Sequence, residues 1–332
     1  MNLSQLKNQW IPISAAKKIT ARPQRILLLG IPLVLFRVKE KIIALHDFCP
    51  HRGAPLSAGK LTGEVLQCAY HGWRFNTSGE CIEIPGLEKT NCANKKVPSY
   101  PTQIHLGLVF VCLEHNAETL PRYEIPALQS EQYCSHLLQS KLEGNVLNIL
   151  ENVLDATHTH FIHAGLLRHD DQRQPVTATL NVNKVSAEIR YDNEAKQSGW
   201  ISALFEKKRT FSIGRFHLPL IAELEYHGPQ HITVAFTFFL SPSTSAEEHQ
   251  VFFLISYRKG WFPGWLKKLF FLPFIKLAFK QDRAILKKQA MNRAYFPESR
   301  FISTELDIIR AHIERLLEGK STDFQKTLTI KL

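Results

Sequence analysis

Two short clusters of cysteine and histidine are the first residues in this sequence that suggest chemistry. One residue separates Cys49 from His51, two separate Cys68 from His71, and sixteen lie between the clusters. Paired Cys/His clusters usually bind a metal. A tetrahedral zinc site of two Cys and two His is one interpretation. An iron–sulfur cluster with two Cys on one iron and two His on the other is the alternative.

The residues around the clusters favour the iron–sulfur interpretation. Zinc fingers usually pair Cys with Cys and His with His, whereas each cluster here supplies one of each. The stretches CPHRGAPLS and CAYHGWRF resemble the two loops of a Rieske iron–sulfur domain. The resemblance implies that Cys49 and Cys68 bind the inner iron of a [2Fe-2S] cluster. It also implies that His51 and His71 bind the outer iron and face the surface, where an electron can leave.

The loops also indicate which Rieske branch the chain resembles. Respiratory-chain Rieske proteins carry an extra cysteine in each loop, and Ala54 and Tyr70 stand at those positions here. The soluble branch of Rieske ferredoxins and Rieske oxygenases is therefore the expected one. The other cysteines have no metal-ligand spacing and are expected to be buried structural thiols; they are Cys81, Cys92, Cys112 and Cys134.

A second group of potential ligands follows in ENVLDATHTHFIH, residues 151–163. His158 and His163 do not lie on one line of an ideal helix, so a helix must end or bend between them to direct both at one ion. Two His and one carboxylate form the facial triad of non-haem Fe(II) oxygenases. Because a Rieske motif precedes it, the segment resembles the iron-binding segment of Rieske non-haem iron oxygenases. His160 is expected to point elsewhere.

The third iron ligand must come from a distant part of the chain. The resemblance implies an Asp on a helix near the C-terminal end, and LAFKQDRAILKKQ, residues 277–289, supplies Asp282. Asp307 in TELDIIRAH is the rival. Asp282 is favoured because apolar neighbours would bury the face around it, whereas Asp307 is surrounded by charged residues.

Asp155 is expected to have a role beside the metal. The resemblance implies that it hydrogen-bonds His158 and links it to His71 of a neighbouring subunit in a head-to-tail homotrimer. In such a trimer one subunit's cluster lies beside the next subunit's iron, which allows electron transfer. Asn152 is expected to line the same site.

The elements that must position these residues follow from hydrophobic patterning. Apolar runs between turn signals predict strands at 25–48, 64–68, 72–76 and 105–113, so 1–117 is expected to be an all-β Rieske domain. LPRYEIPAL, residues 120–128, is a plausible linker. Helical spacing follows from 144, further strands are predicted within 176–258, and helices at 277–293 and 304–318. The expected fold is α+β, with 118–332 forming a catalytic domain of antiparallel sheet packed with helices.

Composition limits the setting and the partners. Hydrophobic residues make up 44% and charged residues 21%, which is ordinary for a globular protein. No signal peptide or membrane span is evident, so a cytoplasmic location is expected. The net charge of +11 suits acidic partners, an anionic substrate or a membrane surface. No nucleic-acid motif is present, and the Lys and Arg are dispersed.

The resemblance implies a terminal oxygenase. Electrons from NAD(P)H would reach the cluster through a separate ferredoxin or flavin reductase, since no G-x-G-x-x-G is present. They would pass to mononuclear Fe(II), which uses O2 to hydroxylate or demethylate a substrate. Monooxygenation or demethylation is favoured over dihydroxylation. The alternatives are a Rieske electron carrier with a non-catalytic binding domain and a zinc-stabilised binding protein.

The segment 260–280, GWFPGWLKKLFFLPFIKLAFK, leads directly to Asp282. Its aromatic residues and lysines predict either a core helix or the entrance of the substrate pocket. The pocket interpretation implies an apolar, ring-containing substrate that carries an anionic group. Replacing Phe270 and Phe271 with Ala is expected to change the product distribution or uncouple O2 use while the iron stays in place.

Overall fold

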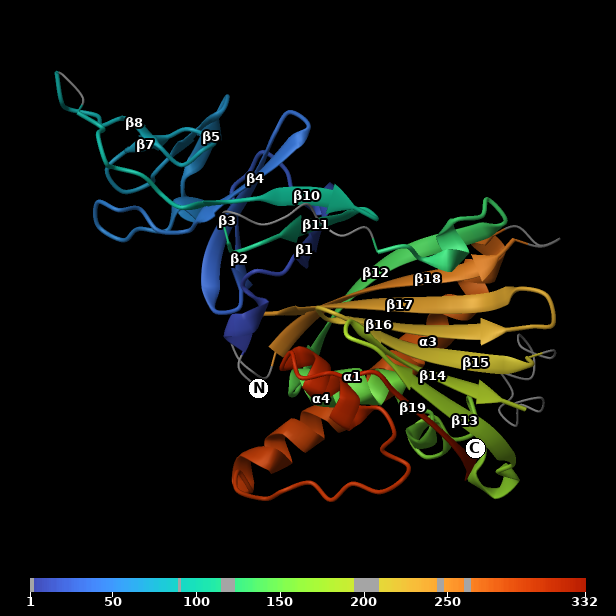
Figure 1. Ribbon diagram of the computed structural model, residues 1–332. Helices are drawn as coiled ribbons and strands as arrows, with labels where there is room; N and C mark the ends of the chain where they lie inside the picture. The colour runs from blue at the N-terminus through green and yellow to red at the C-terminus, as the bar shows by residue number, and fades with distance from the viewer. Residues whose placement is uncertain (1–2, 89–90, 115–122, 194–208, 244–247, 260–263) are drawn as a thin grey trace. The chain divides into compact units, whose positions relative to one another are not determined.

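The computed structural model describes residues 3–88, 91–114, 123–193, 209–243, 248–259 and 264–332 (Figure 1). For residues 264–268, 270 and 271 it describes the backbone only. The chain divides into two compact units, one of residues 2–122 with 241–245 and one of residues 123–240 with 246–332. The predicted boundary between 117 and 118 lies outside the described residues and stays a prediction.

The N-terminal unit is built from short antiparallel strands, as predicted. One four-stranded sheet has the order β2 (Gln24–Leu28), β3 (Ile31–Val38), β4 (Lys41–His46) and β9 (Ser99–Tyr100). A second has the order β5 (Lys60–Thr62), β6 (Val65–Gln67), β7 (Arg74–Phe75) and β8 (Cys81–Glu83). A three-stranded sheet contains β1 (Ile11–Ala15), β11 (Leu108–Val111) and β10 (Thr102–His105). Their apolar side chains form a core that includes Phe36, Leu56, Leu66 and Phe75.

The C-terminal unit is dominated by one antiparallel sheet of eight strands (Figure 1). Its order is β12 (Tyr133–Glu143), β18 (Glu248–Arg258), β17 (Ile232–Pro242), β16 (Ile221–His227), β15 (Phe211–His217), β14 (Ser186–Asp192), β13 (Pro175–Val182) and β19 (Phe324–Lys331). The α+β fold is therefore confirmed. The strands predicted within 176–258 are confirmed by β13, β14, β17 and β18, whereas β12, β15, β16 and β19 were not individually predicted.

Three α-helices in the described part of the chain accompany this sheet. Helix α1 (Val146–Leu154) begins at Asn145, whose side-chain oxygen accepts a hydrogen bond from Leu147 N at 2.9 Å, and its apolar face is buried. Helix α3 (Gly264–Tyr295) is longer than the predicted 277–293. Helix α4 (Arg310–Leu317) is shorter than the predicted 304–318, because residues 304–309 are not helical and include turns at 305–306 and 308–309. No helix in the described ranges is long and apolar enough to cross a membrane.

Candidate metal centres and the adjoining cavities

The two Cys/His loops of the N-terminal unit have the same backbone scheme. Cys49 N donates to Ala54 O at 2.9 Å and Gly53 N to Cys49 O at 2.9 Å. The second loop repeats both bonds, from Cys68 N to Trp73 O at 2.8 Å and from Gly72 N to Cys68 O at 3.2 Å. The two glycines have φ of +73° and +72°, which side chains with a Cβ rarely adopt. The repeated scheme explains why each loop needs a glycine four residues after its cysteine.

The four side chains of these loops gather as a metal cluster would require. Cys49 and Cys68 are each 2% exposed, and the rings of His51 and His71 lie 4.4 Å apart. His51 stacks on Trp73 at 4.9 Å, and its buried Nδ1 has no hydrogen-bond partner. A buried polar atom without a partner is costly, so His51 Nδ1 is placed as a metal ligand would be. Two sulfurs and two ring nitrogens are the donor set of a Rieske cluster.

Burial and hydrogen bonding act in opposite directions on the Cys49 sulfur. Burial raises the pKa of Cys49 to about 11, and the neighbouring Cys68 adds to the shift. Backbone hydrogen bonds from His51 and Arg52 lower the pKa, because they favour the thiolate. A bound metal would stabilise the thiolate further than these backbone N–H groups do, since a coordinating thiol is deprotonated.

The second group of potential ligands lies in the C-terminal unit where α1 ends. Asp155 caps the C-terminus of α1, His158 follows in the 3-10 helix η5 (Thr157–His160), and His163 comes from the next turn. Helix α1 thus ends before the first histidine, and η5 ends between the two histidines, where the five-residue spacing predicted a helix end or bend. Asp282 on α3 reaches the same point, and one ligand atom from each of His158, His163 and Asp282 lies within 4.8 Å of the others.

Both histidines direct the same ring nitrogen toward Asp282. The Nε2 atoms of His163 and His158 lie 3.1 Å and 3.6 Å from Asp282 Oδ1. The Nδ1 of His163 lies 2.9 Å from Gln281 Oε1, which accepts a hydrogen bond from that nitrogen. Because Nδ1 then carries the proton, Nε2 keeps a lone pair that can bind a metal. Sequence reasoning missed Gln281, and the only available signal was its position beside Asp282.

Asp155 supports the turn that carries His158. Its carboxylate accepts hydrogen bonds from the backbone N–H groups of Thr157 and His158 and from the Thr157 hydroxyl. The Nδ1 of His158 lies 3.4 Å from Asp155 Oδ2, close enough for electrostatic attraction but without hydrogen-bond geometry. Burial raises the pKa of Asp155, but His158 and Thr157 outweigh it and hold the pKa below its usual value.

The Asp282 carboxylate beside His163 makes this site attractive to positive charge. Burial lowers the pKa of His163, but the Asp282 carboxylate and the Gln281 hydrogen bond outweigh burial and raise it. A divalent metal would satisfy the same attraction without a proton. The residues therefore fit a mononuclear metal of the facial-triad type, which combines two histidines with one carboxylate.

The remaining predicted residues lie as follows. Asp307 accepts a hydrogen bond from Thr304 N at 2.6 Å and is exposed. It does not belong to the group of potential ligands formed by His158, His163 and Asp282. His160 is buried and its Nδ1 faces the His169 carbonyl oxygen at 3.2 Å. Asn152 Nδ2 donates to Asp282 Oδ1 at 3.4 Å, so it does lie at the same place.

A cavity of about 180 Å³ opens beside His158, His163 and Asp282. One wall comes from the sheet, through Leu224, Tyr226, Phe236, Phe238 and Phe253, and the other from α1 and α3. Phe238, Phe253 and Phe279 stack against one another, with centroid distances from 4.5 to 6.0 Å. Arg209, which is buried, places a guanidinium 4.0 Å from the centre of the Tyr226 ring in this lining.

The predicted aromatic segment contributes only part of this wall. Phe274 and Phe279 line the cavity. The strand residues Phe236, Phe238 and Phe253 were not predicted as lining. The remaining predicted aromatic side chains, including Phe270 and Phe271, lie outside the described residues. A second cavity of about 830 Å³ reaches Asp155 and His158 and has polar groups such as Glu151 and Arg310 in its lining.

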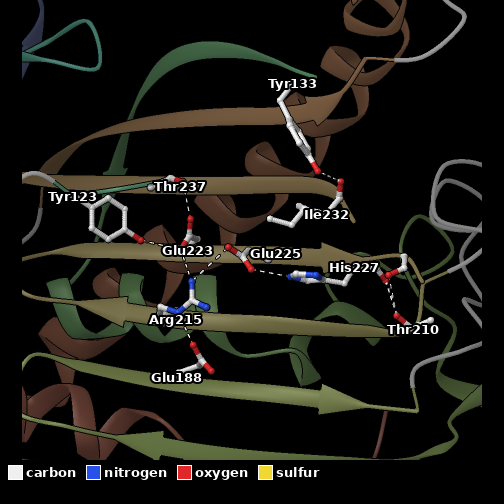
Figure 2. Close-up of polar contacts among 11 residues, drawn as sticks. Tyr123, Tyr133, Glu188, Thr210, Arg215, Glu223, Glu225, His227, Ile232 and Thr237 are labelled. Atoms are coloured by element: carbon white, nitrogen blue, oxygen red, sulfur yellow. Dashed lines mark hydrogen bonds and ion pairs between the residues drawn. The ribbon is translucent and has the colours of Figure 1, made fainter. Parts of the chain in front are cut away.

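A cluster of charged residues occupies the opposite face of the same sheet (Figure 2). Side chains alternate along a strand, so Glu223 and Glu225 face away from the cavity that Leu224 and Tyr226 line. Arg215 lies 2.7 Å from Glu223 and 3.5 Å from Glu225 and also pairs with Glu188 at 2.6 Å.

Further groups complete this outer network. The Tyr123 hydroxyl donates to Glu223 at 2.8 Å, Thr237 donates to Glu223 at 3.4 Å, and His227 Nε2 lies 2.8 Å from Glu225. Glu223 and Glu225 are almost fully buried, with side chains 1% and 4% exposed. Each buried carboxylate in the network therefore has a cation or a hydrogen-bond donor beside it.

Comparison with known proteins identifies both units. Residues 9–101 match the Rieske [2Fe-2S] domain, and residues 142–321, more than half of the chain, match the vanillate O-demethylase oxygenase C-terminal domain. The fold resembles that of dicamba monooxygenase bound to dicamba, with a TM-score of 0.82 and 19% identity over 95% of this chain and 97% of that one.

Curated relatives match over part of their length. The oxygenase subunit of 3-chlorobenzoate-3,4-dioxygenase from Comamonas testosteroni is 34% identical over 173 residues, which is 50% of this chain and 40% of the relative. Chloroplastic pheophorbide a oxygenase from Arabidopsis thaliana is 32% identical over 186 residues, 51% of this chain and 35% of the relative. The match thus spans less than half of either relative. With both domain models matched in order, the chain belongs to the Rieske non-haem iron oxygenases, whose terminal components combine a Rieske domain with a catalytic domain of this type.

Proposed function

We propose that this protein is a terminal oxygenase that hydroxylates or demethylates an apolar, ring-containing substrate with O2. The observation that carries the proposal is the convergence of His158, His163 and Asp282 beside an aromatic cavity, in a chain that also carries the Rieske loops. A pure electron carrier would need neither the three convergent ligands nor the cavity. Monooxygenation or demethylation is favoured over dihydroxylation by the vanillate O-demethylase match.

The proposed metal-binding roles follow the geometry of the two sites. Cys49, His51, Cys68 and His71 would hold the [2Fe-2S] cluster, and His158, His163 and Asp282 would hold the mononuclear iron. When bound, the iron would supply a site for O2 with open coordination positions. Gln281 keeps the proton of His163 on Nδ1, and Asn152 hydrogen-bonds the Asp282 carboxylate, so these two residues orient the ligands.

The overall reaction defines what the protein must receive. In a monooxygenation, one oxygen atom enters the substrate and the other leaves as water, which takes two electrons and two protons. If the oxidised carbon is a methyl group on oxygen or nitrogen, the product releases formaldehyde and the methyl group is lost. The electrons would come from NAD(P)H through a separate reductase or ferredoxin, and the net charge of +11 suits an acidic donor.

The cavity indicates the class of substrate. Stacked rings of Phe238, Phe253 and Phe279 favour a flat apolar ring, because aromatic pairs gain from offset stacking. The volume of about 180 Å³ suits a small ring system. Arg209 in the lining supports a substrate with an anionic group, such as a ring carboxylate.

A substrate screen tests the function. The purified protein, a surrogate reductase and NADH are supplied with ring carboxylates and their methyl esters, and coupled O2 use and product mass are measured. We expect turnover of at least one acid, with its neutral ester poorer. Asp282→Asn should abolish product formation, whereas Asp307→Asn, the matched control, should leave it unchanged. Product formation that survives Asp282→Asn would contradict the proposal.

Electron delivery is proposed to run between subunits of a head-to-tail homotrimer through Asp155. Asp155→Asn keeps an oxygen that can accept from Thr157 N and His158 N, so both metal centres should stay in place. Turnover should nevertheless stop, because the carboxylate that links the centres is gone. Single-turnover kinetics measure transfer from the cluster to the iron. Transfer at the wild-type rate would rule out the bridging role.

A further inference from the structure

Two cysteines outside the cluster loops face each other in the N-terminal unit. Cys81 begins β8 and is 5% exposed, and Cys92 lies in the segment that follows β8 and is half-buried. Both are free thiols, and their Sγ atoms are 3.3 Å apart. A disulfide bond is about 2.05 Å long, so the two sulfurs would need to approach by little more than one ångström.

We propose that Cys81 and Cys92 are an oxidation site, at which a low-molecular-weight disulfide such as oxidised glutathione forms a reversible protein disulfide. The backbone already holds the two residues together. Cys81 N donates to Lys95 O at 2.9 Å, and Lys95 N donates to Cys92 O at 3.1 Å. Because this turn is formed before oxidation, closing the bond requires little further ordering of the backbone.

The exposure of the two thiols sets the order of the exchange. Cys92 is the accessible one, so its thiolate attacks one sulfur of oxidised glutathione and one glutathione leaves as a thiolate. The Cys81 thiolate then attacks the Cys92 sulfur of the mixed disulfide, and the second glutathione leaves. In total the two cysteine thiols lose two electrons and two protons, and one oxidised glutathione becomes two reduced glutathione molecules.

The bond would fasten a segment that supports one of the cluster loops. Pro85 follows β8 on the way to Cys92, and its Cγ lies 3.2 Å from the position that a Cβ on Gly72 would occupy. Gly72 directly follows His71 in the loop of Cys68 and His71. Cys81 also belongs to the same hydrophobic core as Cys49 and Cys68. Oxidation would therefore restrain the wall against which this loop packs.

The other two thiols provide an internal comparison. Cys112 is buried and donates to Lys7 O at 3.4 Å, and Cys134 on β12 is half-buried, as Cys92 is. Among the described hydrogen bonds outside the cluster loops, the contact between Cys81 and Cys92 is the one that joins two sulfurs. Selective oxidation of this pair is therefore the specific consequence of the proposal.

The first test is chemical and needs no turnover. The cluster-loaded protein is treated with oxidised glutathione, alkylated, digested and analysed by mass spectrometry. We expect one peptide pair joined through Cys81 and Cys92, lighter by two hydrogen atoms and separated again by dithiothreitol. Cys92→Ser should lose this product, and the matched control Cys134→Ser should keep it. A stable glutathione adduct on Cys92, or free thiols at both positions, would overturn the proposal.

The second test measures what the bond does. The visible absorption of the cluster is followed during incubation with a chelator in the absence of thiols. The oxidised protein should lose its cluster several-fold more slowly than the reduced protein, whereas in Cys92→Ser the two treatments should give the same rate. Equal rates for the two wild-type forms would show that the bond does not fasten the cluster loop. Neither test depends on the oxygenase activity.

Discussion

Both faces of the large sheet of the C-terminal unit have histidines beside carboxylates, which are partly buried at the cavity and almost fully buried on the outer face, yet the two groups serve different purposes. On the cavity face, the Nε2 atoms of His158 and His163 converge on Asp282. On the outer face, His227 Nε2 is paired with Glu225, and Arg215 lies between Glu188, Glu223 and Glu225 (Figure 2). The guanidinium of Arg215 thus supplies a positive charge to these glutamates, whereas the described partners of Asp282 are the two histidines and Asn152.

This difference teaches how to distinguish a metal site from a structural ion network. In both places the contacts of the other ring nitrogen or carboxylate oxygen decide whether a ligand atom is left for a metal. Gln281 and Asp155 lie beside the Nδ1 atoms of the cavity histidines, which leaves both Nε2 atoms directed at a common point. In the outer network the donors and acceptors are used within the protein itself. On the cavity face the three ligands require a metal ion as their cation, whereas on the outer face Arg215 is the cation.

The largest expected effect comes from removing the shared carboxylate of the cavity face. Asp282→Ala should lose the mononuclear iron and lower coupled O2 use by more than about 100-fold, because loss of a ligand exceeds the loss of an outer partner. The Rieske absorption should remain. Iron content per chain and O2 uptake measure both quantities. Retained non-cluster iron in this variant would contradict the interpretation of the cavity face as a metal site.

The outer network predicts a loss of stability in place of a loss of metal. Arg215→Leu should lower the free energy of unfolding by about 3 kcal/mol, because Glu223 and Glu225 then stay buried without their cation. The folded fraction should keep its normal iron content. Urea denaturation measures the change. The double variant Arg215→Leu, Glu223→Gln should recover part of the loss, and further destabilisation by the second substitution would contradict the charge argument.

Gln281 tests whether the orientation of a histidine matters separately from the ligand itself. Gln281→Leu removes the acceptor from His163 Nδ1 and should weaken iron binding by about 10-fold to 100-fold while the fold stays intact. Gln281→Glu keeps an acceptor and should retain tighter iron binding than Leu. Titration of the iron-free protein with Fe(II) under anaerobic conditions gives the affinities. Equal affinities for the Leu variant and the wild type would remove Gln281 from the site.

The smallest expected effect is a pH dependence on the outer face. Burial, with help from Arg215, lowers the pKa of His217 from 6.5 to about 4. Between these values the unfolded chain binds a proton that the folded protein refuses, so the free energy of unfolding falls as the pH falls through this window. His217 should contribute roughly 2 kcal/mol to this loss after allowance for its partial exposure.

The variant His217→Phe isolates that contribution. When the pH is lowered from 6.5 to 4, the stability of the variant should decrease less than that of the wild type. Above pH 6.5, position 217 should contribute no pH dependence to the stability of either protein. Burial raises the pKa of Glu225, but His227 and Arg215 outweigh it and hold the pKa below its usual value of 4.5. Glu225 therefore acts only at the acid end of the window. Identical pH profiles for variant and wild type would refute the role of His217.

The ligand types and their approximate spacing could be predicted because they lie close together in the sequence. Cys49 with His51, Cys68 with His71, and His158 with His163 are local pairs, and the chemistry of such pairs restricts the metal. Helix geometry also indicated that the two histidines do not share one ideal helix, and the structure ends α1 at Leu154, before both of them. Asp282 was expected by family resemblance, and the structure places it with the two histidines.

The parts that sequence reasoning missed depend on contacts between distant strands. Phe236 and Phe253 line the cavity because their positions in β17 and β18 put them on one face of the sheet. Cys81 and Cys92 have no motif spacing, yet the turn after β8 brings their sulfurs to 3.3 Å. Register and turn geometry decide such contacts, and neither follows from residue type.

The sequence by itself determined the chemistry that this protein can hold: two Cys/His loops, a pair of histidines after a helix, and glycines where the loops need a positive φ. The tertiary structure alone decided which distant groups face one another, such as Asp282 with both histidines and Arg215 with three glutamates. The physical reason is that ligand preference is a property of a side chain and its near neighbours. The pairing of charges across strands depends instead on the register of a sheet whose order is not the order of the chain.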